Sequence, residues 1–447
     1  MTNDFSPAMM TDMYEYTMLD AAMQDGTADR RCVFEVFTRH LPAGRRYGIA
    51  AGLGRILEML QDFRPSESDL RFLRDRHVVS ERTAKWLEDF RFSGTIRAYP
   101  EGEAFFANSP ILQVEGTFGE CTLLETLILS VLNYDSAIAS AASRMTSAAG
   151  DRPCMDMGGR RTNESAAVAA ARAAIVGGFA GTANLAAAKK YDLVCIGTAA
   201  HAFTLLHDDE RDAFVSQINA LGPGTTLLTD TYNIEQAITT AVEVAGPQLG
   251  GIRIDSGDLA SLAQKARKQL DSLGATNTKI TVTNDLDEYA LAALATAPVD
   301  SYGVGTMLVT GSGHPTCAMV YKLTEREGAD GEMHGVAKKS FGKSTDGWRK
   351  RALRCYQYGL AQGELVVCGS AEKLAAYEPD HDVYGDTKDL LITAVDHGDV
   401  DESLTGHEAL LAARDRHRRA LDELPVTALS LSQGEQAIPT EVITLNR

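Results

Sequence analysis

The chain has 447 residues, of which 44% are apolar and 23% are charged, the ordinary balance of a folded globular protein with room for two or three domains. It carries 61 Asp and Glu against 43 Lys and Arg, for a net charge of −18, which argues against a surface that coats nucleic acid or anionic lipid. Any anionic substrate must therefore be held by a local cluster of positive side chains.

The cysteines and the N-terminus are typical of a cytoplasmic protein. The seven cysteines form no Cys-x-x-Cys pair and lie mostly in apolar runs, so we expect reduced core thiols and no zinc site. The first residues show no basic segment followed by an apolar core, and no apolar run reaches the length of a membrane span. We therefore expect neither a membrane nor a nucleic-acid partner.

Residues 9–23 are predicted to form a helix, because Thr11-Asp12 is an N-cap signal followed by helix-forming residues. Tyr14 and Tyr16 are two positions apart, so they cannot both lie on the apolar face of that helix. One of the two is expected to point away from the core of its own domain.

The segment after this helix predicts a small α/β domain. Residues 31–39 alternate like a strand, residues 49–60 and 66–90 have helical patterns, and residues 94–114 give short strands punctuated by Gly and Pro. We place this N-terminal domain at residues 1–130.

A long apolar helix over residues 122–145 leads into a different pattern, in which short apolar runs alternate with Ala-rich helical stretches. The runs are 153–157, 166–175, 193–196, 226–228, 251–254, 279–282 and 299–304. Strands spaced by helices predict a parallel sheet, and about seven such units suit an α/β barrel better than an open sheet. We place this domain at residues 131–335.

The remaining residues, 336–447, form a C-terminal segment. It contains a basic stretch at 338–351, further strands and an acidic helical tail. We expect the tail, after Asp399, to be a solvated helix.

Polar residues follow six of the predicted strands, at the carboxyl ends that face the ligand-binding edge of a parallel sheet. Any one of them taken alone fits a helix cap or a turn, but six polar strand ends in one domain indicate a ligand site. They are Arg160 and Arg161 after 153–157, Thr198 and His201 after 193–196, Asp230 after 226–228, Asp255 and Asp258 after 251–254 with Arg253 inside that strand, Asn284 and Asp285 after 279–282, and Gly305 and Thr306 after 299–304.

The residue types at these strand ends favour a phosphorylated substrate. Gly303-Val304-Gly305 places backbone N–H groups where no Cβ blocks a phosphate. The carboxylates suit ribose hydroxyls or a hydrated Mg²⁺ beside a diphosphate. The arginines suit a carboxylate or phosphate held by two hydrogen bonds.

Several longer motifs run through the chain. They include Thr11-Asp12-Met13-Tyr14, Phe34-Glu35-Val36-Phe37, Gly159-Arg160-Arg161, Gly177-Gly178-Phe179-Ala180-Gly181-Thr182-Ala183-Asn184, Gly197-Thr198-Ala199-Ala200-His201, Ile252-Arg253-Ile254-Asp255-Ser256-Gly257-Asp258 and Gly303-Val304-Gly305-Thr306. In these motifs the chain resembles the nicotinate phosphoribosyltransferase family, over residues 8–355. The resemblance implies a type II phosphoribosyltransferase fold, in which an irregular, incomplete α/β barrel is accompanied by an N-terminal α/β domain and C-terminal segments pack back on both. It also implies a homodimer with active sites shared between subunits.

The reaction implied by the resemblance joins nicotinate to 5-phosphoribosyl 1-diphosphate (PRPP), giving nicotinate mononucleotide and diphosphate for NAD biosynthesis. ATP is hydrolysed through a phosphohistidine, which by position is His201. Asp255 and Asp230 would hold ribose or metal, and Mg²⁺ is expected to bind through the diphosphate, with no protein ligand assigned directly.

The resemblance also assigns the binding residues. Two positions depart from the family: Met157 stands where an aromatic residue is usual, and Asp346-Gly347 replaces Pro-Gly. The nicotinate set is Tyr14 from the neighbouring subunit, Met157, Arg160, Thr198 and Arg253. The PRPP and phosphate set is Arg161, Asn284, Asp285, Gly305 and Thr306, and a loop with Lys343 and Thr345 is assigned to ATP or diphosphate.

Three alternatives stay open at this point. A nicotinamide enzyme of the same fold carries an aspartate at the position of Ala183, and a carboxylate there would repel nicotinate, so Ala183 favours the acid. A quinolinate enzyme of the same fold would be shorter and have a denser basic pocket. A catalytically silent metabolite-binding barrel would have lost the histidine or the phosphate loop, and this chain has both.

Overall fold

The computed structural model describes residues 6–338 and 347–445. Within these two ranges, none of the helices has the length and apolar character needed to cross a lipid bilayer. Six of the seven cysteines are buried, and Cys195 is exposed.

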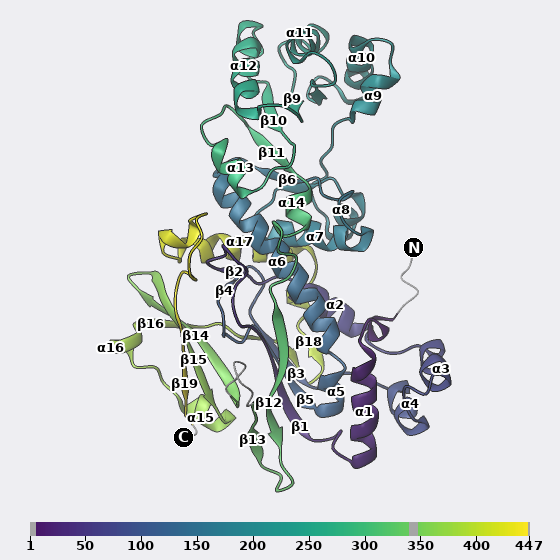
Figure 1. Ribbon diagram of the computed structural model, residues 1–447, viewed down its shortest axis with the longest axis vertical. Helices are drawn as coiled ribbons and strands as arrows, with labels where there is room; N and C mark the ends of the chain where they lie inside the picture. The colour runs from purple at the N-terminus through teal and green to yellow at the C-terminus, as the bar shows by residue number, and fades with distance from the viewer. Residues whose placement is uncertain (1–5, 339–346, 446–447) are drawn as a thin grey trace. The chain divides into compact units, whose positions relative to one another are not determined.

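The chain divides into two compact units; Figure 1 labels their elements and colours the chain by residue number. Met1–Ser140 and Thr316–Arg447 together make the first unit, and Ala141–Pro315 makes the second. The first unit is thus built from both ends of the chain. Helix α6 (Glu125–Ala149) begins in the first unit and ends in the second.

The first unit is organised around an antiparallel sheet with the strand order β13-β12-β1-β5-β3-β17-β18. Because β1 lies between β12 and β5, strands from distant parts of the sequence share one sheet and one apolar core. The strands are β1 (Arg31–Thr38), β3 (Thr95–Ala98), β5 (Leu112–Thr117), β12 (Met319–Glu327), β13 (Met333–Gly335), β17 (Ile392–Asp396) and β18 (Asp399–Val400). The N-terminal helices are α1 (Met13–Asp25), α2 (Leu53–Gln61), α3 (Glu67–Asp75), α4 (Glu81–Glu88) and α5 (Phe118–Thr122).

The C-terminal segment adds a second sheet to this unit, with the order β16-β14-β15-β19. A two-stranded sheet of β2 and β4 completes the strands described here. The elements are β2 (Gly48–Ile49), β4 (Ala104–Phe105), β14 (Arg349–Gln357), β15 (Leu360–Gly369), β16 (Asp386–Asp389), β19 (Thr440–Thr444), α15 (Ala371–Ala376), α16 (His381–Tyr384) and α17 (Gly406–Asp422).

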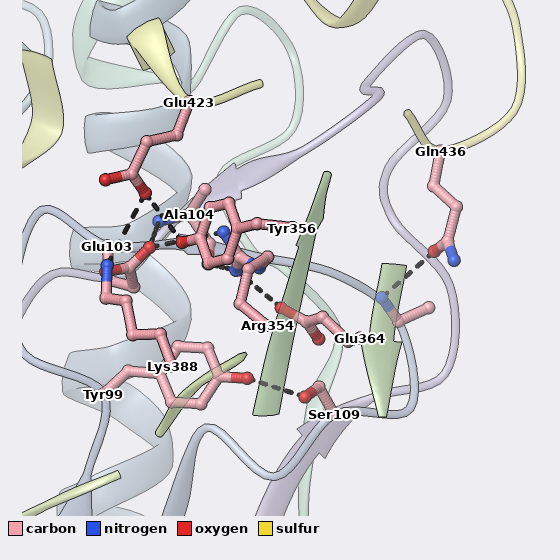
Figure 2. Close-up of polar contacts among 11 residues, drawn as sticks. Tyr99, Glu103, Ala104, Ser109, Arg354, Tyr356, Glu364, Lys388, Glu423 and Gln436 are labelled. Atoms are coloured by element: carbon pink, nitrogen blue, oxygen red, sulfur yellow. Dashed lines mark hydrogen bonds and ion pairs between the residues drawn. The ribbon is translucent and has the colours of Figure 1, made fainter. Parts of the chain in front are cut away.

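A buried ion cluster ties this C-terminal sheet to the N-terminal part of the unit, as Figure 2 shows. The Arg354 guanidinium lies 2.6 Å from Glu364 Oε1 and 3.4 Å from Glu103 Oε1, and it donates a 2.7 Å hydrogen bond to the carbonyl of Ala104. Lys388 Nζ contacts the other oxygen of Glu103 at 2.9 Å. The C-terminal segment therefore packs back on the N-terminal domain, as the resemblance implied.

The acidic tail contains the helix α17 and the strand β19, and the expectation that it is a solvated helix is wrong. Leu410, Ala413 and Ala420 of α17 are at most 2% exposed, and His417 is 4% exposed. Burial lowers the pKa of His417 to about 4. The tail is amphipathic, so one face packs in the core while its charged residues remain in solvent.

The second unit is a parallel sheet with the order β7-β6-β11-β10-β9-β8. The sheet curls into half of a barrel, which confirms the expected incomplete α/β barrel. Five of the predicted strands are present at or within the predicted positions. The strands are β6 (Cys154–Asp156), β7 (Gly181–Thr182), β8 (Thr226–Leu228), β9 (Gly251–Ile254), β10 (Lys279–Val282) and β11 (Ser301–Val304).

One of the runs counted among the strands is a helix. Residues 166–175 lie inside α7 (Glu164–Val176), whose first turn is capped by the side chain of Asn163. The segment is rich in alanine, the strongest helix former, and so its helical propensity prevails over its apolar character. The other helices of the unit are α8 (Leu185–Tyr191), α9 (His201–Leu206), α10 (Glu210–Leu221), α11 (Ile234–Ala245), α12 (Leu259–Ser272), α13 (Glu288–Ala293) and α14 (Thr306–Val309).

A second correction concerns residues 193–196, which do not form a full strand. The segment makes a single parallel bridge, between Cys195 and Thr182 of β7. Because β7 has only two residues, it offers almost no edge for pairing. The segment therefore lies beside the edge strand β7, and Val194 within it is 63% exposed.

Candidate active site

The carboxyl ends of β8 and β9 bring together the acidic and basic residues predicted from the sequence. Asp230 follows β8, Arg253 lies within β9, and Asp255 follows β9. Thr198 and His201 reach the same place from the segment after the Cys195 bridge. Parallel strands end at one edge of the sheet, which is why residues far apart in sequence meet here.

His201 is the first residue of α9, and its ring lies between hydroxyl and carboxylate groups. Its Nδ1 is 3.2 Å from Thr231 Oγ1. Its Nε2 is 3.8 Å from Asp230 Oδ1 and 3.9 Å from Asp255 Oδ2. The side chain is 41% exposed, so a ligand can reach the ring.

Asp230 is the buried member of this group, with a side chain that is 1% exposed. Its Oδ2 accepts hydrogen bonds from the backbone N–H of Asp255 at 3.0 Å and from Ser256 Oγ at 2.7 Å. Its Oδ1 has no hydrogen-bond partner in the part of the chain that the structure describes. One carboxylate oxygen is thus fixed by the protein while the other is left for His201 or a ligand.

Arg253 is held by a hydroxyl and faces a carboxylate. Its Nη1 donates to Thr198 Oγ1 at 2.6 Å, and its Nη2 lies 3.7 Å from Asp255 Oδ2. Burial lowers the pKa of Arg253, while Asp255 and Asp230 act in the opposite direction. A partly buried guanidinium with one hydroxyl partner and a distant carboxylate retains donors for an anionic ligand.

The turn after β6 carries Met157, Arg160 and Arg161. Both arginines are exposed, and the charge of Arg160 adds to the lowering of the Arg253 pKa, so the two guanidinium groups act on one another. Met157 lies over Gly303 of β11, where an added Cβ would come within 2.6 Å of the methionine sulfur. This close approach explains the glycine.

The remaining predicted positions follow β10 and β11. Asn284 and Asp285 are exposed and have positive φ values of 96° and 40°, a backbone conformation that Asn and Asp tolerate better than most residues. Gly305 and Thr306 are partly buried at the start of the short helix α14. Asp258 caps α12 by accepting a hydrogen bond from the backbone of Ser261.

Tyr14 belongs to the first unit. It is 43% exposed on α1, whereas Tyr16 is 2% exposed, which confirms that one of the two tyrosines points away from the core. Partial burial and the neighbouring Glu125 carboxylate raise the pKa of Tyr14 to about 12. Lys343 and Thr345 lie outside the described residues.

Sequence reasoning missed the hydroxyl groups that hold the carboxylates. Thr231 contacts His201, Ser256 donates to Asp230, and Thr283 Oγ1 donates to Asp255 Oδ1. In each case the hydroxyl residue sits at or next to a strand end that also carries an acid or an amide. A hydroxyl residue beside an acid or an amide at a strand end is therefore the sequence feature that could have identified these residues.

The sequence matches one protein family over most of its length. Residues 9–133 match the nicotinate phosphoribosyltransferase (NAPRTase) N-terminal domain, and residues 153–365 match the NAPRTase family. The sequence is 49% identical to nicotinate phosphoribosyltransferase pncB1 of Mycobacterium tuberculosis, over 99% of this chain and 96% of that protein. It is 37% identical to nicotinate phosphoribosyltransferase of Bacillus subtilis, over 78% of this chain and 74% of that protein.

The fold is also similar to that of a solved structure. The crystal structure of human nicotinic acid phosphoribosyltransferase superposes with a TM-score of 0.80 and 24% sequence identity, covering 96% of this chain and 98% of that one. Both parts of the fold and nearly the whole sequence therefore agree, and the chain belongs to the nicotinate phosphoribosyltransferase family.

Proposed function

We propose that this protein transfers phosphoribose from PRPP to nicotinate, giving nicotinate mononucleotide and diphosphate, and that it couples this reaction to ATP hydrolysis. The observation that carries the proposal is the open cluster at the ends of β8 and β9. It sets a histidine, two carboxylates and a guanidinium side by side, with one oxygen of Asp230 unused by the protein among the described residues.

Nicotinate is a planar carboxylate, and Arg253 and Arg160 are the groups suited to bind it. Thr198 holds Arg253 through the 2.6 Å hydrogen bond, which limits how far the guanidinium can turn. Met157 offers an apolar surface for the pyridine ring, without the stacking geometry of an aromatic side chain. Tyr14 of the second subunit of a homodimer would cover the other face of the ring.

The phosphoribose would lie along the ends of β10 and β11. Gly305 and Thr306 would bind the 5-phosphate through backbone N–H groups, and Asn284, Asp285 and Arg161 would bind the remaining hydroxyl and phosphate groups. These residues are exposed or partly exposed, so they are free to meet a substrate of this size.

The acidic residues fit Mg²⁺ only in company with a phosphorylated substrate. Among the described residues, no group of three or more His, Cys, Asp or Glu side chains is arranged to hold a metal ion. Asp255 and the free oxygen of Asp230 are hard oxygen donors, and Mg²⁺ is often bound by one or two carboxylates together with substrate phosphates. When bound, the ion neutralises charge on the leaving diphosphate.

In the transfer step the pyridine nitrogen bonds to C1 of the ribose as the bond from C1 to the diphosphate oxygen breaks. Positive charge builds up on the sugar in the transition state. The carboxylates of Asp230 and Asp255 are fixed by hydrogen bonds from Ser256 and Thr283, so their negative charge is already oriented before the charge develops.

His201 would accept the phosphoryl group of ATP on a ring nitrogen, with ADP as the leaving group, and later lose it to water. The phosphoryl group adds negative charge beside the diphosphate site, which couples ATP hydrolysis to PRPP binding. Lys343 and Thr345 are proposed to lie near ATP or diphosphate. ATP and PRPP are metabolites of the cytoplasm, where we place the enzyme.

The test measures formation of nicotinate mononucleotide from nicotinate, PRPP and Mg²⁺, with and without ATP, for the wild type and His201→Ala. Nicotinamide and quinolinate are run in parallel. We expect turnover of nicotinate alone, and loss of the ATP stimulation in His201→Ala. Turnover of nicotinamide would contradict the argument from Ala183, and absence of any turnover would favour a silent metabolite-binding barrel.

A further inference from the structure

We propose that Asp156 is a positioning residue for nicotinate binding, which fixes the turn that carries Arg160 to the end of β7. Asp156 is the last residue of β6 and is 2% exposed, so it is placed beneath the ligand edge and is not itself a ligand. The inference deepens the proposed function, because it rests on Arg160 binding the carboxylate of nicotinate.

Each oxygen of the Asp156 carboxylate accepts one hydrogen bond from a different segment. Oδ1 accepts from the backbone N–H of Gly158 at 2.8 Å, and Oδ2 accepts from Thr182 Oγ1 at 2.6 Å. Gly158 opens the turn that leads to Arg160, and its carbonyl accepts from the backbone N–H of Arg161 at 2.8 Å. The carboxylate therefore joins the arginine turn to a neighbouring strand end.

The hydrogen bond from Thr182 links Asp156 to the segment that carries Ala183. Thr182 Oγ1 donates to Asp156 and also accepts from the backbone N–H of Asn184 at 3.0 Å. The backbone N–H of Ala183 donates to the carbonyl of Asp156 at 2.8 Å. The carboxylate and the backbone carbonyl of Asp156 together thus hold the basic turn and the segment that carries Ala183.

The turn at Gly158 is closely packed against its neighbours. A Cβ at Gly158 would lie 2.3 Å from Val309 Cγ1 and 3.0 Å from the carbonyl oxygen of Gly305. The turn is therefore packed against α14 and its N-cap residue on one side and hydrogen-bonded to Asp156 on the other. Without the carboxylate, the Gly158 amide loses its acceptor and the turn loses one of its two restraints.

Burial raises the pKa of Asp156, and the Thr182 hydroxyl and Gly158 amide oppose this. The carboxylate is held by these two hydrogen bonds. An amide of the same shape can replace it: the oxygen would accept from Gly158, and the NH₂ group would donate to Thr182 Oγ1. Asp156→Asn should therefore preserve the turn, whereas Asp156→Ala should release it.

The experiment measures KM for nicotinate and for PRPP in Asp156→Ala and Asp156→Asn, each with Arg160 intact and with Arg160→Ala. We expect Asp156→Ala to raise the nicotinate KM at least tenfold and to change the PRPP KM less than threefold. Asp156→Asn should stay within threefold of the wild type for both. In the Arg160→Ala background, Asp156→Ala should add less than twofold, because the residue it positions is gone.

Asp300 provides a matched control on the same sheet. It accepts a backbone hydrogen bond from Ile280 at 2.8 Å and pairs with Lys279 ahead of β11, so Asp300→Ala removes a comparable acceptor at the amino end of the strands. We expect it to leave both KM values unchanged. If Asp156→Ala does not fold, Thr182→Val decides, with an expected rise of at least threefold in the nicotinate KM and recovery in Thr182→Ser.

Two results would overturn the inference. One is an equal rise in the KM values for nicotinate and PRPP. The other is a rise in the nicotinate KM that is the same with and without Arg160, since a purely structural role would not depend on that arginine. Failure of the proposed function is distinct, because the wild type itself would then not turn over nicotinate.

Discussion

The molecule contains two clusters of charged side chains, one closed and one open. In the first unit, the cluster around Arg354 has side chains of Arg354, Glu103 and Glu364 that are at most 1% exposed. In the second unit, the cluster at the ends of β8 and β9 leaves His201 41% and Asp255 28% exposed. The closed cluster holds segments together, whereas the open one retains charge for a ligand.

The pKa values of the arginines in the two clusters shift in opposite directions. Burial lowers the pKa of Arg354, but Glu364 and Glu103 more than offset this and raise it. The carboxylate paired with Arg253, that of Asp255, stands 3.7 Å away, and burial prevails over the effects of Asp255 and Asp230, so the pKa of Arg253 is lowered. A buried cation in contact with its partners cannot be removed without leaving a buried charge uncompensated, while one whose carboxylate stands off is available for binding.

The largest effect is expected from opening the closed cluster. Arg354→Met leaves the buried Glu364 carboxylate without its cation and Glu103 with Lys388 alone, and breaking a buried pair in this way costs about 3–5 kcal/mol. The measurement is the free energy of unfolding in urea. On the same strand, Arg351→Met breaks a pair with Asp389 whose side chains are 30% and 54% exposed, which should cost about 1 kcal/mol at most. Equal losses in the two variants would contradict the comparison.

The second prediction concerns the open cluster. Arg253→Lys loses the fork of donors that reaches both Thr198 and a ligand carboxylate, and hydrogen bonds to charged groups contribute about 1.5–3 kcal/mol each. We expect kcat/KM for nicotinate to fall roughly 10- to 100-fold, with the free energy of unfolding changed by less than about 0.5 kcal/mol. A loss of stability without a loss of activity would show that Arg253 has a structural role, as Arg354 has in the closed cluster.

A buried carboxylate outside both clusters extends the comparison, because its partners are hydroxyl and amide donors in place of a cation. Glu15 is 0% exposed and accepts from Thr11 Oγ1 and from the N–H and Oγ1 of Thr126. Burial raises its pKa to about 7. Since the folded state then binds the proton more tightly than the unfolded chain, stability should fall as the pH rises from about 4.5 to 7.

We expect Glu15→Gln to remove this part of the pH dependence, which is on the order of 3 kcal/mol. The measurement is urea unfolding of the wild type and Glu15→Gln at several pH values across that range. An unchanged slope in the variant would mean that other groups titrate there.

The smallest effect is expected at the support of Asp230. Ser256→Ala removes one of the two donors to Asp230 Oδ2 and leaves the backbone N–H of Asp255 in place. Losing one such hydrogen bond costs about 1 kcal/mol, or roughly a fivefold fall in kcat. Ser272→Ala is the control, because its hydroxyl donates within α12 to the carbonyl of Gln269; it should leave kcat unchanged.

Much of the second unit could be predicted from the sequence. The strands at 226–228, 251–254 and 279–282 lie where the apolar runs predicted them, because a buried parallel strand needs a continuous run of apolar residues. The runs at 166–175 and 193–196 are also apolar and are therefore predicted as strands, but neither forms a full strand. An apolar run shows burial or helix formation without showing which neighbour will pair with it.

The sequence by itself determined the class of fold, the family and the residue types at the strand ends, because these depend on local pattern and on motifs. The tertiary structure decided which groups share a site. Asp156 reaches Thr182, and Asp230 reaches Ser256, across gaps of 26 residues each, and such contacts depend on which strands become neighbours. It also decided that the tail is packed and that Arg354 is closed off, since burial is a property of the assembled core and not of any one segment.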